Sequence, residues 1–349
     1  MSKRGATARP ARWAAASFLG LAVAALGAPA AEAGRLDDVK KAGEVHCGVA
    51  LSNPGYAFTN DKGEIVGFDV DQCRALAAAI FGNPNKIKLT RMNLQTAFAT
   101  LPSGGVDVLT HRFTWTFTRD VGTGMDYTRP MVFDGQGFIL RKSLKVSKLA
   151  ELNGATFCLA QGTTTEANVA DYFRTHNMQY KSVSFASQEQ ANDAYVAGRC
   201  DVYSNDAFSL RARRTSYQNP DEHLILDEII SKEPIGPLVA HGDDNWKDLV
   251  FWTMNLLIAA EEDGITQANV DEMRTKSANP EVLRILGTSE NYGERLGLSK
   301  DWAYNVIKAV GNYGEMWDRW LGPKTPIGAN RGVNALWIKG GLMISPPFR

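Results

Sequence analysis

A short sequence in the middle of the chain, Thr163-x-x-Glu166 directly after Gly162, has a clear chemical signature. In such a capping box the threonine hydroxyl accepts a backbone N–H three residues on, and the glutamate reaches back toward the start of the helix. The N–H groups that stay free at that helix start attract anions. A capping box on its own is usually only a cap, so an anion site at Thr163 and Thr164 is a hypothesis at this point.

Four cysteines form the second group of reactive side chains: Cys47, Cys73, Cys158 and Cys200. A zinc site is a poor interpretation, because there is no Cys-x-x-Cys spacing and the five histidines are scattered. Four cysteines permit three disulfide connectivities. Pairing neighbours within each half of the chain leaves the halves free to move, so we favour Cys47–Cys73 and Cys158–Cys200.

Motifs for covalent chemistry are absent from the sequence. It contains no Gly-x-Ser-x-Gly, no His-Glu-x-x-His and no P-loop sequence. We therefore predict no catalytic residue, no metal and no cofactor.

The N-terminus has the pattern of a secretory signal peptide. Four basic residues precede an apolar run from Trp13 to Leu26, and Ala31-Glu32-Ala33 follows. The run is shorter than the roughly 20 residues that span a bilayer, and no later segment is long or apolar enough. We predict that residues 1–33 form a signal peptide cleaved after Ala33. We expect the mature protein to be periplasmic and not to insert stably into a membrane. Export also places the cysteines in an oxidising compartment.

Length and charge narrow the function classes. The whole chain has 38 basic and 38 acidic residues. The predicted signal peptide, residues 1–33, contains four basic residues and Glu32, so the mature chain has 34 basic and 37 acidic residues. This balance, with no basic stripe, argues against nucleic acid as a partner. About 316 residues remain, more than one hydrophobic core usually serves, which favours two lobes.

Strand-like and helix-like segments alternate along the mature chain. The expected strands are 44–50, 86–92, 106–110, 155–159, 180–185 and 200–204. The expected helices are 69–81, 95–101, 164–175, 189–197, 246–262, 269–276, 280–286 and 302–320. Such alternation predicts mainly parallel sheets flanked by helices.

Two extended stretches, 135–140 and 233–240, are predicted to cross between the lobes, so that the chain returns to the lobe where it began. We therefore expect a first lobe at 34–139, a second lobe at 140–237, and a return to the first lobe at 238–349 that carries a C-terminal helical extension.

One segment resembles a known family. Gly67-Phe68-Asp69-Val70-Asp71, followed by Leu76, Ala77 and Ile80, is similar to the signature of the family 3 solute-binding proteins, the polar amino-acid receptors of bacterial ABC importers. Gln72 departs from it, because the family usually has an apolar residue there. Segments 115–120, 134–138, 162–166, 229–234 and 340–343, with the extension at 312–315, resemble the general L-amino-acid-binding subgroup. The resemblance implies a type II periplasmic-binding-protein fold of two α/β lobes with two crossover strands as the hinge.

The resemblance also implies site residues. Arg119 falls where the family holds the arginine that grips the ligand's α-carboxylate, and a planar guanidinium matches the two oxygens of that group. Thr114 would contact the same carboxylate, with Thr116 flanking the same loop. Thr163 and Thr164 would bind it from the second lobe, in agreement with the anion-site hypothesis.

The α-ammonium of the amino-acid ligand is expected to bind in the second lobe. Asp206 follows a predicted strand and corresponds to the acidic residue that pairs with the ligand's α-ammonium. Tyr56, Phe58 and Leu94 are candidates for the wall of the side-chain pocket, with core packing as an equal alternative.

Specificity is the feature in which this sequence departs from related receptors. His111 and Arg112 stand where those receptors tend to have small or neutral polar residues. If Arg112 reaches the pocket, we expect a preference for an acidic or amide side chain.

The function implied is that of a substrate-binding protein that closes around a free L-amino acid, with a broad range of polar ligands such as glutamate, glutamine, aspartate and asparagine. It would deliver the ligand to an ABC permease and act as a monomer. Two alternatives stay open: a dehydratase on the same fold with Glu166 as acid or base, and a sensory amino-acid-binding protein that acts through a separate partner.

Overall fold

The computed structural model describes Gly5, residues 34–50 and residues 53–349. Apart from Gly5, the predicted signal peptide lies outside the described residues, as does Ala33 at its cleavage site. No helix within the described ranges is long and apolar enough to cross a membrane.

The first sheet contains five strands in the order β4-β1-β5-β14-β6. They span Val45–Val49 (β1), Ile87–Arg91 (β4), Val108–Leu109 (β5), Met125–Tyr127 (β6) and Leu238–Ala240 (β14). β1 runs parallel to β4 and β5, whereas β14 is antiparallel to β5 and β6. β14 runs the opposite way because it enters from the second sheet, as the predicted return of the chain requires.

The second sheet has the order β10-β9-β11-β8-β12. Its strands span Gln136–Arg141 (β8), Thr156–Ala160 (β9), Lys181–Phe185 (β10), Val202–Asp206 (β11) and His223–Ile225 (β12). β9 is parallel to β10 and β11, and β8 is antiparallel to β11 and β12. Each sheet thus has four strands in one direction and one antiparallel strand, which the chain reaches from the other sheet.

A two-stranded ribbon joins the sheets. β7 (Val132–Asp134) leads into β8, and β13 (Glu233–Ile235) leads into β14. The two strands pair antiparallel, with Val132 opposite Ile235 and Asp134 opposite Glu233. Both crossovers expected from the sequence therefore lie side by side, where a small change in backbone angles can move one sheet against the other. A small hairpin, β2 (Phe58–Thr59) with β3 (Ile65–Val66), lies apart from this ribbon.

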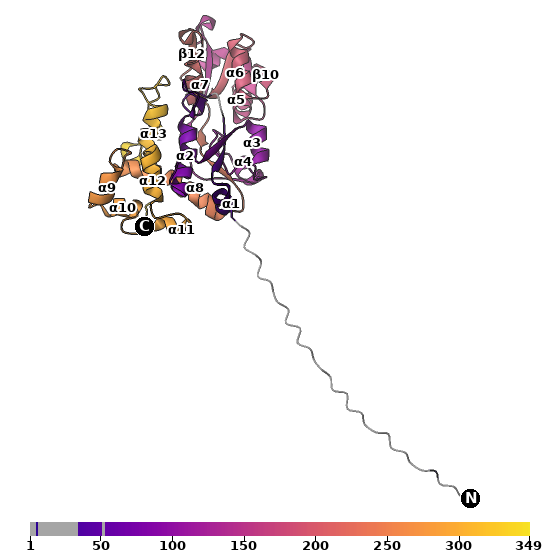
Figure 1. Ribbon diagram of the computed structural model, residues 1–349. Coiled ribbons are helices and arrows are strands. Elements are labelled where there is room, and N and C mark those ends of the chain that lie inside the picture. Colours follow the sequence, from indigo (N-terminus) through magenta and orange to yellow (C-terminus); the bar gives the residue numbers. More distant parts are fainter. Residues whose placement is uncertain (1–4, 6–33, 51–52) are drawn as a thin grey trace. The chain divides into compact units, whose positions relative to one another are not determined.

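Helices surround both sheets (Figure 1). Those of residues 34–122 are α1 (Arg35–Ala42), α2 (Phe68–Phe81), α3 (Leu94–Thr100) and α4 (Phe117–Gly122). Those between the crossovers are α5 (Thr164–Thr175), α6 (Gln188–Val196) and α7 (Ala207–Arg214). The C-terminal ones are α8 (Asp244–Glu262), α9 (Val270–Lys276), α10 (Pro280–Ile285), α11 (Tyr292–Arg295), α12 (Trp302–Val310) and α13 (Tyr313–Trp320). Short 3-10 helices occur at Lys142–Leu144, Leu149–Leu152, Pro220–Glu222, Gly332–Asn334 and Trp337–Lys339.

The expected single helix over 302–320 was wrong, because the structure divides it into α12 and α13. Gly311 ends α12 with a φ of 79°, a conformation that suits glycine. Asn312 then starts a new helix, since its side chain accepts the N–H of Glu315 while that glutamate accepts the N–H of Asn312. The C-cap and the N-cap are adjacent, so one periodic pattern continues across two helices.

The C-terminal helices belong to the core beneath the first sheet. α12 packs against α2 and α8, and α13 contacts the same two helices (Figure 1). Trp246, Trp302 and Trp317 are each at most 2% exposed in one hydrophobic cluster with residues of α2. The extension is therefore an integral part of this core.

The two predicted disulfides are confirmed. Cys47 pairs with Cys73 and joins β1 to α2, and Cys158 pairs with Cys200 and joins β9 to the segment before β11. Each bond lies within one of the two sheet-and-helix assemblies, so neither ties the first sheet to the second.

Removing the Cys158–Cys200 bond, which spans 42 residues, is expected to destabilise the second sheet by about 2–4 kcal/mol, because the unfolded chain regains loop entropy. Chemical unfolding of the Cys158→Ala/Cys200→Ala double variant measures the difference. The matched Cys47→Ala/Cys73→Ala variant, which opens a 26-residue span, should lose a similar amount. Unchanged unfolding midpoints in both variants would contradict the prediction.

Candidate functional site

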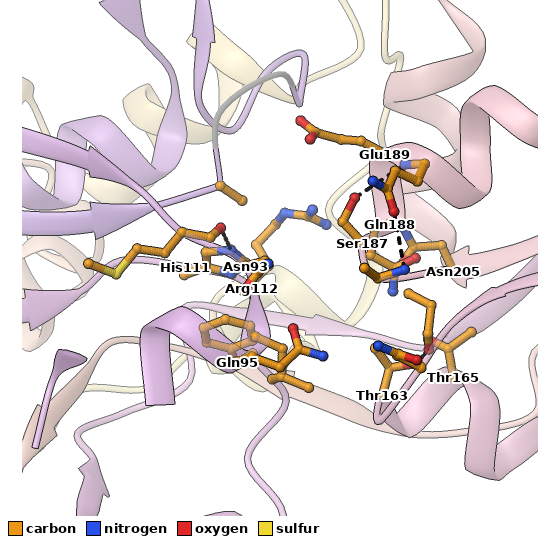
Figure 2. Close-up of a pocket in the computed structure, with 18 of the residues that line it drawn as sticks. Asn93, Gln95, His111, Arg112, Thr163, Thr165, Ser187, Gln188, Glu189 and Asn205 are labelled. Atoms are coloured by element: carbon orange, nitrogen blue, oxygen red, sulfur yellow. Dashed lines mark hydrogen bonds between the residues drawn. The ribbon is translucent and has the colours of Figure 1, made fainter. Parts of the chain in front are cut away.

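A cavity of about 560 Å³ lies where the carboxyl ends of the parallel strands in both sheets meet. One side is formed by the ends of β1 and β4, the start of α3 and residues 111–114. The other is formed by the start of α5, residues 186–190 and the end of β11. Figure 2 shows His111 and Arg112 facing Asn205 and Thr163 across this space. In α/β folds, ligands bind at this edge because the connecting loops and helix starts gather there.

Arg119 lines the cavity from α4 and is 8% exposed. Its Nη1 donates to the Thr114 carbonyl at 3.0 Å, and its guanidinium lies 5.6 Å from the centre of the Phe98 ring. No acidic side chain among the described residues lies within ion-pair distance of it. The charge of Arg119 is thus held in place by a carbonyl and a ring, and it is available to an anion in the cavity.

Asp206 lines the same cavity from the end of β11 and is 7% exposed. Its Oδ2 lies 3.7 Å from Nη1 of Arg112, which also bonds to the hydroxyl of Ser209. Arg112 therefore does reach the cavity, but its charge already faces Asp206. This weakens the argument that Arg112 selects an acidic ligand side chain.

The carboxyl of Asp206 is in an unusual electrostatic environment. Burial, together with the neighbouring carboxylates of Asp134 and Glu233, raises the pKa of Asp206 to about 8 against the opposing effect of Arg112 and Arg119. Burial likewise raises the pKa of Asp134 to about 6, although the N–H groups of Gly135 and Phe208 bond to its carboxylate. A cation placed beside Asp206 would favour its ionised form.

Glu233 is a residue that the sequence analysis did not single out. It lies on the crossover strand β13, 2% exposed, and accepts a hydrogen bond from the hydroxyl of Thr114 next to the first sheet. It also accepts from Thr164 at 3.4 Å and Asn168 at 3.1 Å, both on α5 of the second sheet. Its carboxylate thus connects the crossover to both sides of the cavity. The one signal in the sequence was a charged residue beside Pro234 in an apolar stretch.

The helix start predicted at Thr163 is present, with one difference. The Thr163 hydroxyl accepts the N–H of Glu166 at 3.2 Å, as a cap does. The Glu166 carboxylate accepts the N–H of Gly162 at 2.8 Å and the hydroxyl of Ser184 at 3.0 Å, so the reciprocal bond goes to the residue before the cap. Thr163 and Thr164 line the cavity, whereas Glu166 is not among the lining residues.

Backbone N–H groups of Thr164 and Thr165 form no hydrogen bond with any residue that the structure describes. Both residues line the cavity at the positive end of the α5 dipole. This part of the wall suits an anion, as the capping sequence indicated.

The remaining predicted residues divide into two groups. Thr114 and Leu94 line the cavity, and the Thr114 carbonyl accepts from both Arg119 and Tyr127. Thr116 and Tyr56 are not among the lining residues. Thr116 caps α4 by accepting the N–H of Arg119 at 3.3 Å, and the Tyr56 ring supports the Arg112 guanidinium at 4.6 Å.

Two further side chains have defined surroundings. Phe58 packs edge-to-face on Trp320, 6.0 Å between ring centres, away from the cavity. His111 lines the cavity (Figure 2), where burial and the neighbouring Arg112 lower its pKa to about 3. Because His111 is neutral, it adds no charge to the cavity. Within the described ranges, no group of three or more His, Cys, Asp or Glu side chains could hold a metal ion.

Comparison with known proteins shows several similar to this chain. Residues 45–323 match the bacterial extracellular solute-binding proteins, family 3. The general L-amino acid-binding periplasmic protein AapJ of Rhizobium johnstonii is 52% identical, over 95% of this chain and 97% of its own length. The glutamate/glutamine/aspartate/asparagine-binding protein BztA of Rhodobacter capsulatus is 47% identical, over 96% of this chain and 99% of its own.

Among solved structures, a periplasmic binding protein of an ABC transporter from Brucella ovis with glutathione bound is similar to this chain. It has a TM-score of 0.88 and 50% sequence identity, over 91% of this chain and 100% of that one. Its arrangement of elements is thus shared over nearly the whole described structure.

Proposed function

The chain belongs to the bacterial extracellular solute-binding proteins of family 3, and from this membership and the cavity we propose that it captures free polar L-amino acids and delivers them to the permease of an ABC importer. One observation supports amino acids as the ligand class. Arg119 and Asp206 are both buried, come from opposite sides and line one cavity. A guanidinium opposite a carboxylate complements the two charges of an amino-acid zwitterion.

Roles of the site residues follow from this arrangement. The ligand's α-carboxylate bonds to Arg119, to Thr114 and to the start of α5 at Thr163 and Thr164. Its α-ammonium pairs with Asp206, and Leu94 contacts the aliphatic part of its side chain. Tyr56 and Thr116 act through neighbours, since Tyr56 supports Arg112 and Thr116 caps the helix of Arg119.

Capture proceeds by hinge closure in this proposal. The β7–β13 ribbon is the hinge between a first lobe, residues 34–139 with 238–349, and a second lobe, residues 140–237. A ligand that contacts both lobes only when they are closed shifts the population toward the closed form. The permease then recognises that form. The protein acts as a monomer in the periplasm, the compartment named for the similar protein AapJ, after cleavage behind Ala33.

No chemical step is part of this proposal. Glu166, the candidate acid or base of a dehydratase, bonds to Gly162 and Ser184 and is not among the residues that line the cavity. Amino acids recovered unchanged after incubation with the protein would be the expected result.

Glutathione is a second candidate ligand, favoured by the similarity to the glutathione-bound protein of Brucella ovis. Its γ-glutamyl residue has the same α-carboxylate and α-ammonium as a free amino acid. A cavity of about 560 Å³ also has room for more than a small amino acid.

Thermal unfolding of the mature protein against the twenty L-amino acids and glutathione tests the proposal. A ligand at 100 times its Kd stabilises the folded form by about 2.7 kcal/mol. We expect glutamate, glutamine, aspartate and asparagine to raise the Tm clearly, and D-glutamate to serve as the control that does not. If no amino acid and no glutathione raised the Tm, the proposed function would be rejected.

A further inference from the structure

Arg213 on α7 lines the cavity and is 7% exposed. The structure shows no hydrogen bond and no ion pair from its guanidinium to any residue in the described ranges, and its buried Nε has no partner there. A buried cation without a hydrogen-bonding or charged partner is strongly unfavourable. Such a group in the wall of a binding cavity indicates an anionic partner that the protein itself does not supply.

Four other charged side chains that line the cavity form ion pairs with one another. Arg91 pairs with Glu189 and Arg112 pairs with Asp206, each across the cavity. Asp193 also lines the cavity, but it is exposed and forms no ion pair with Arg213. Two guanidiniums therefore remain without an acidic partner among the described residues, Arg119 and Arg213. The α-carboxylate of an amino acid satisfies Arg119 in the proposed function and leaves Arg213.

Polar side chains line the cavity together with Arg213. Tyr203, the hydroxyl of which accepts from Asn205 at 2.8 Å and donates to Gln188 at 3.1 Å, lies within electrostatic range of Arg213. Asn205 and Gln188 both line the cavity (Figure 2). Amide groups in the same cavity wall as an unpaired guanidinium suit a carboxylate ligand.

We infer that Arg213 pairs with a second carboxylate of the ligand and so selects ligands that have one in addition to the α-carboxylate. This inference rests on the proposed function and deepens it. From the sequence we expected Arg112 to select an acidic or amide ligand side chain. We assign the recognition of a carboxylate to Arg213 instead, because the Arg112 charge faces Asp206. The second carboxylate comes either from the side chain of a dicarboxylic amino acid or from the C-terminus of a γ-glutamyl peptide such as glutathione.

Calorimetry on the Arg213→Met variant tests the inference with glutamate, glutamine, leucine and glutathione as ligands. We expect the affinity for glutamate or glutathione, whichever supplies the second carboxylate, to fall about 10- to 100-fold. This fall corresponds to the usual free energy of a hydrogen bond to a charged group. The affinities for glutamine and leucine should change by less than about threefold, because these ligands have no second carboxylate to bond to Arg213. Arg213→Lys, which keeps the charge but not the fork of donors, should lie in between.

The matched control is Arg211→Met, which removes the same charge from an exposed position of the same helix. It should leave all four affinities unchanged. The Tm without ligand separates binding from structure: Arg213→Met should be at least as stable as the wild type, since an unpaired buried charge is removed. A merely structural arginine would lower the Tm on removal.

Each outcome has a distinct meaning. A selective loss for glutamate assigns the second carboxylate to the amino-acid side chain, and a selective loss for glutathione assigns it to the peptide; both support the inference. An equal loss for glutamate and glutamine, or no loss for any ligand, overturns it. If the wild type bound none of the four ligands, the proposed function itself would fail, which is a separate result.

Discussion

Arg119→Met is expected to weaken the binding of every amino-acid ligand by about 30- to several-thousand-fold, because truncating one partner of a buried charge pair costs about 2–5 kcal/mol. The side chain is 8% exposed, and it is held by the Thr114 carbonyl and the Phe98 ring. Because Arg119 has no acidic partner among the described residues, we expect the ligand to supply the anion that it binds. All amino acids have the α-carboxylate, so the loss should not depend on the ligand side chain.

Isothermal titration with glutamate and leucine measures this loss. Arg119→Lys should retain part of the affinity, because a single ammonium replaces the paired donors of the guanidinium. Arg174→Met provides the control, since the Arg174 side chain is 76% exposed on α5 and pairs with Asp171. Wild-type affinity in the Arg119→Met variant would show that the α-carboxylate binds elsewhere.

Asp206→Asn is expected to reduce affinity to a comparable extent and also to remove a dependence of binding on pH. Burial, with Asp134 and Glu233 nearby, raises the pKa of Asp206 from 3.8 to about 8. The raised pKa lets the ligand-free carboxyl take up a proton more readily near neutral pH, although Arg112 faces it. The ligand's ammonium favours the ionised form, so binding releases that proton.

The sign of the pH effect follows from proton linkage. Affinity of the wild type should fall as the pH decreases below about 8, by up to tenfold per pH unit for one released proton. The raised pKa also makes the ligand-free protein less stable as the pH rises from about 4 to about 8, since the folded state holds a proton that the unfolded chain has lost. Ligand binding offsets this second effect.

Titrations between pH 6 and 8, in buffers with different ionisation enthalpies, count the protons released. The Asp206→Asn variant should release none and show a flat profile. Asp134→Asn removes a neighbouring negative charge, so the pKa of Asp206 should decrease and the profile should move to lower pH. A wild-type affinity that stayed constant over this range would show that ligand binding releases no proton from Asp206.

Much of the fold could be predicted because its signals are local. The periodicity of 164–175 and the cap at Thr163 define α5 without reference to distant residues. The cysteine spacing, together with the argument that the lobes must move, was enough to assign both disulfides. This reasoning missed the break at Gly311, where one amphipathic pattern continues through two helices, and it did not find the short helices α4 and α7.

The site was predicted in part, through residues that a family resemblance could identify one by one. Arg119, Asp206, Thr114, Thr163, Thr164, Arg112 and Leu94 do line one cavity. The resemblance did not indicate that Thr116 would cap the helix of Arg119 or that the Tyr56 ring would lie against the Arg112 guanidinium. It was also silent on the bonds of Glu233 to both sides of the cavity.

Local sequence patterns determined most of the longer elements and the cap at Thr163, since these depend on neighbours a few positions apart. The cysteine pairs came from the expectation of two mobile lobes, and the charged residues for a zwitterion came from the family resemblance. Tertiary structure alone decided which charges meet. Arg112 and Asp206 are far apart in the chain yet form a pair, and Arg213, one of several arginines on α7, is the one buried against the cavity without a partner. Electrostatic pairing depends on distance in space, and only the packing of the two sheets determines that distance.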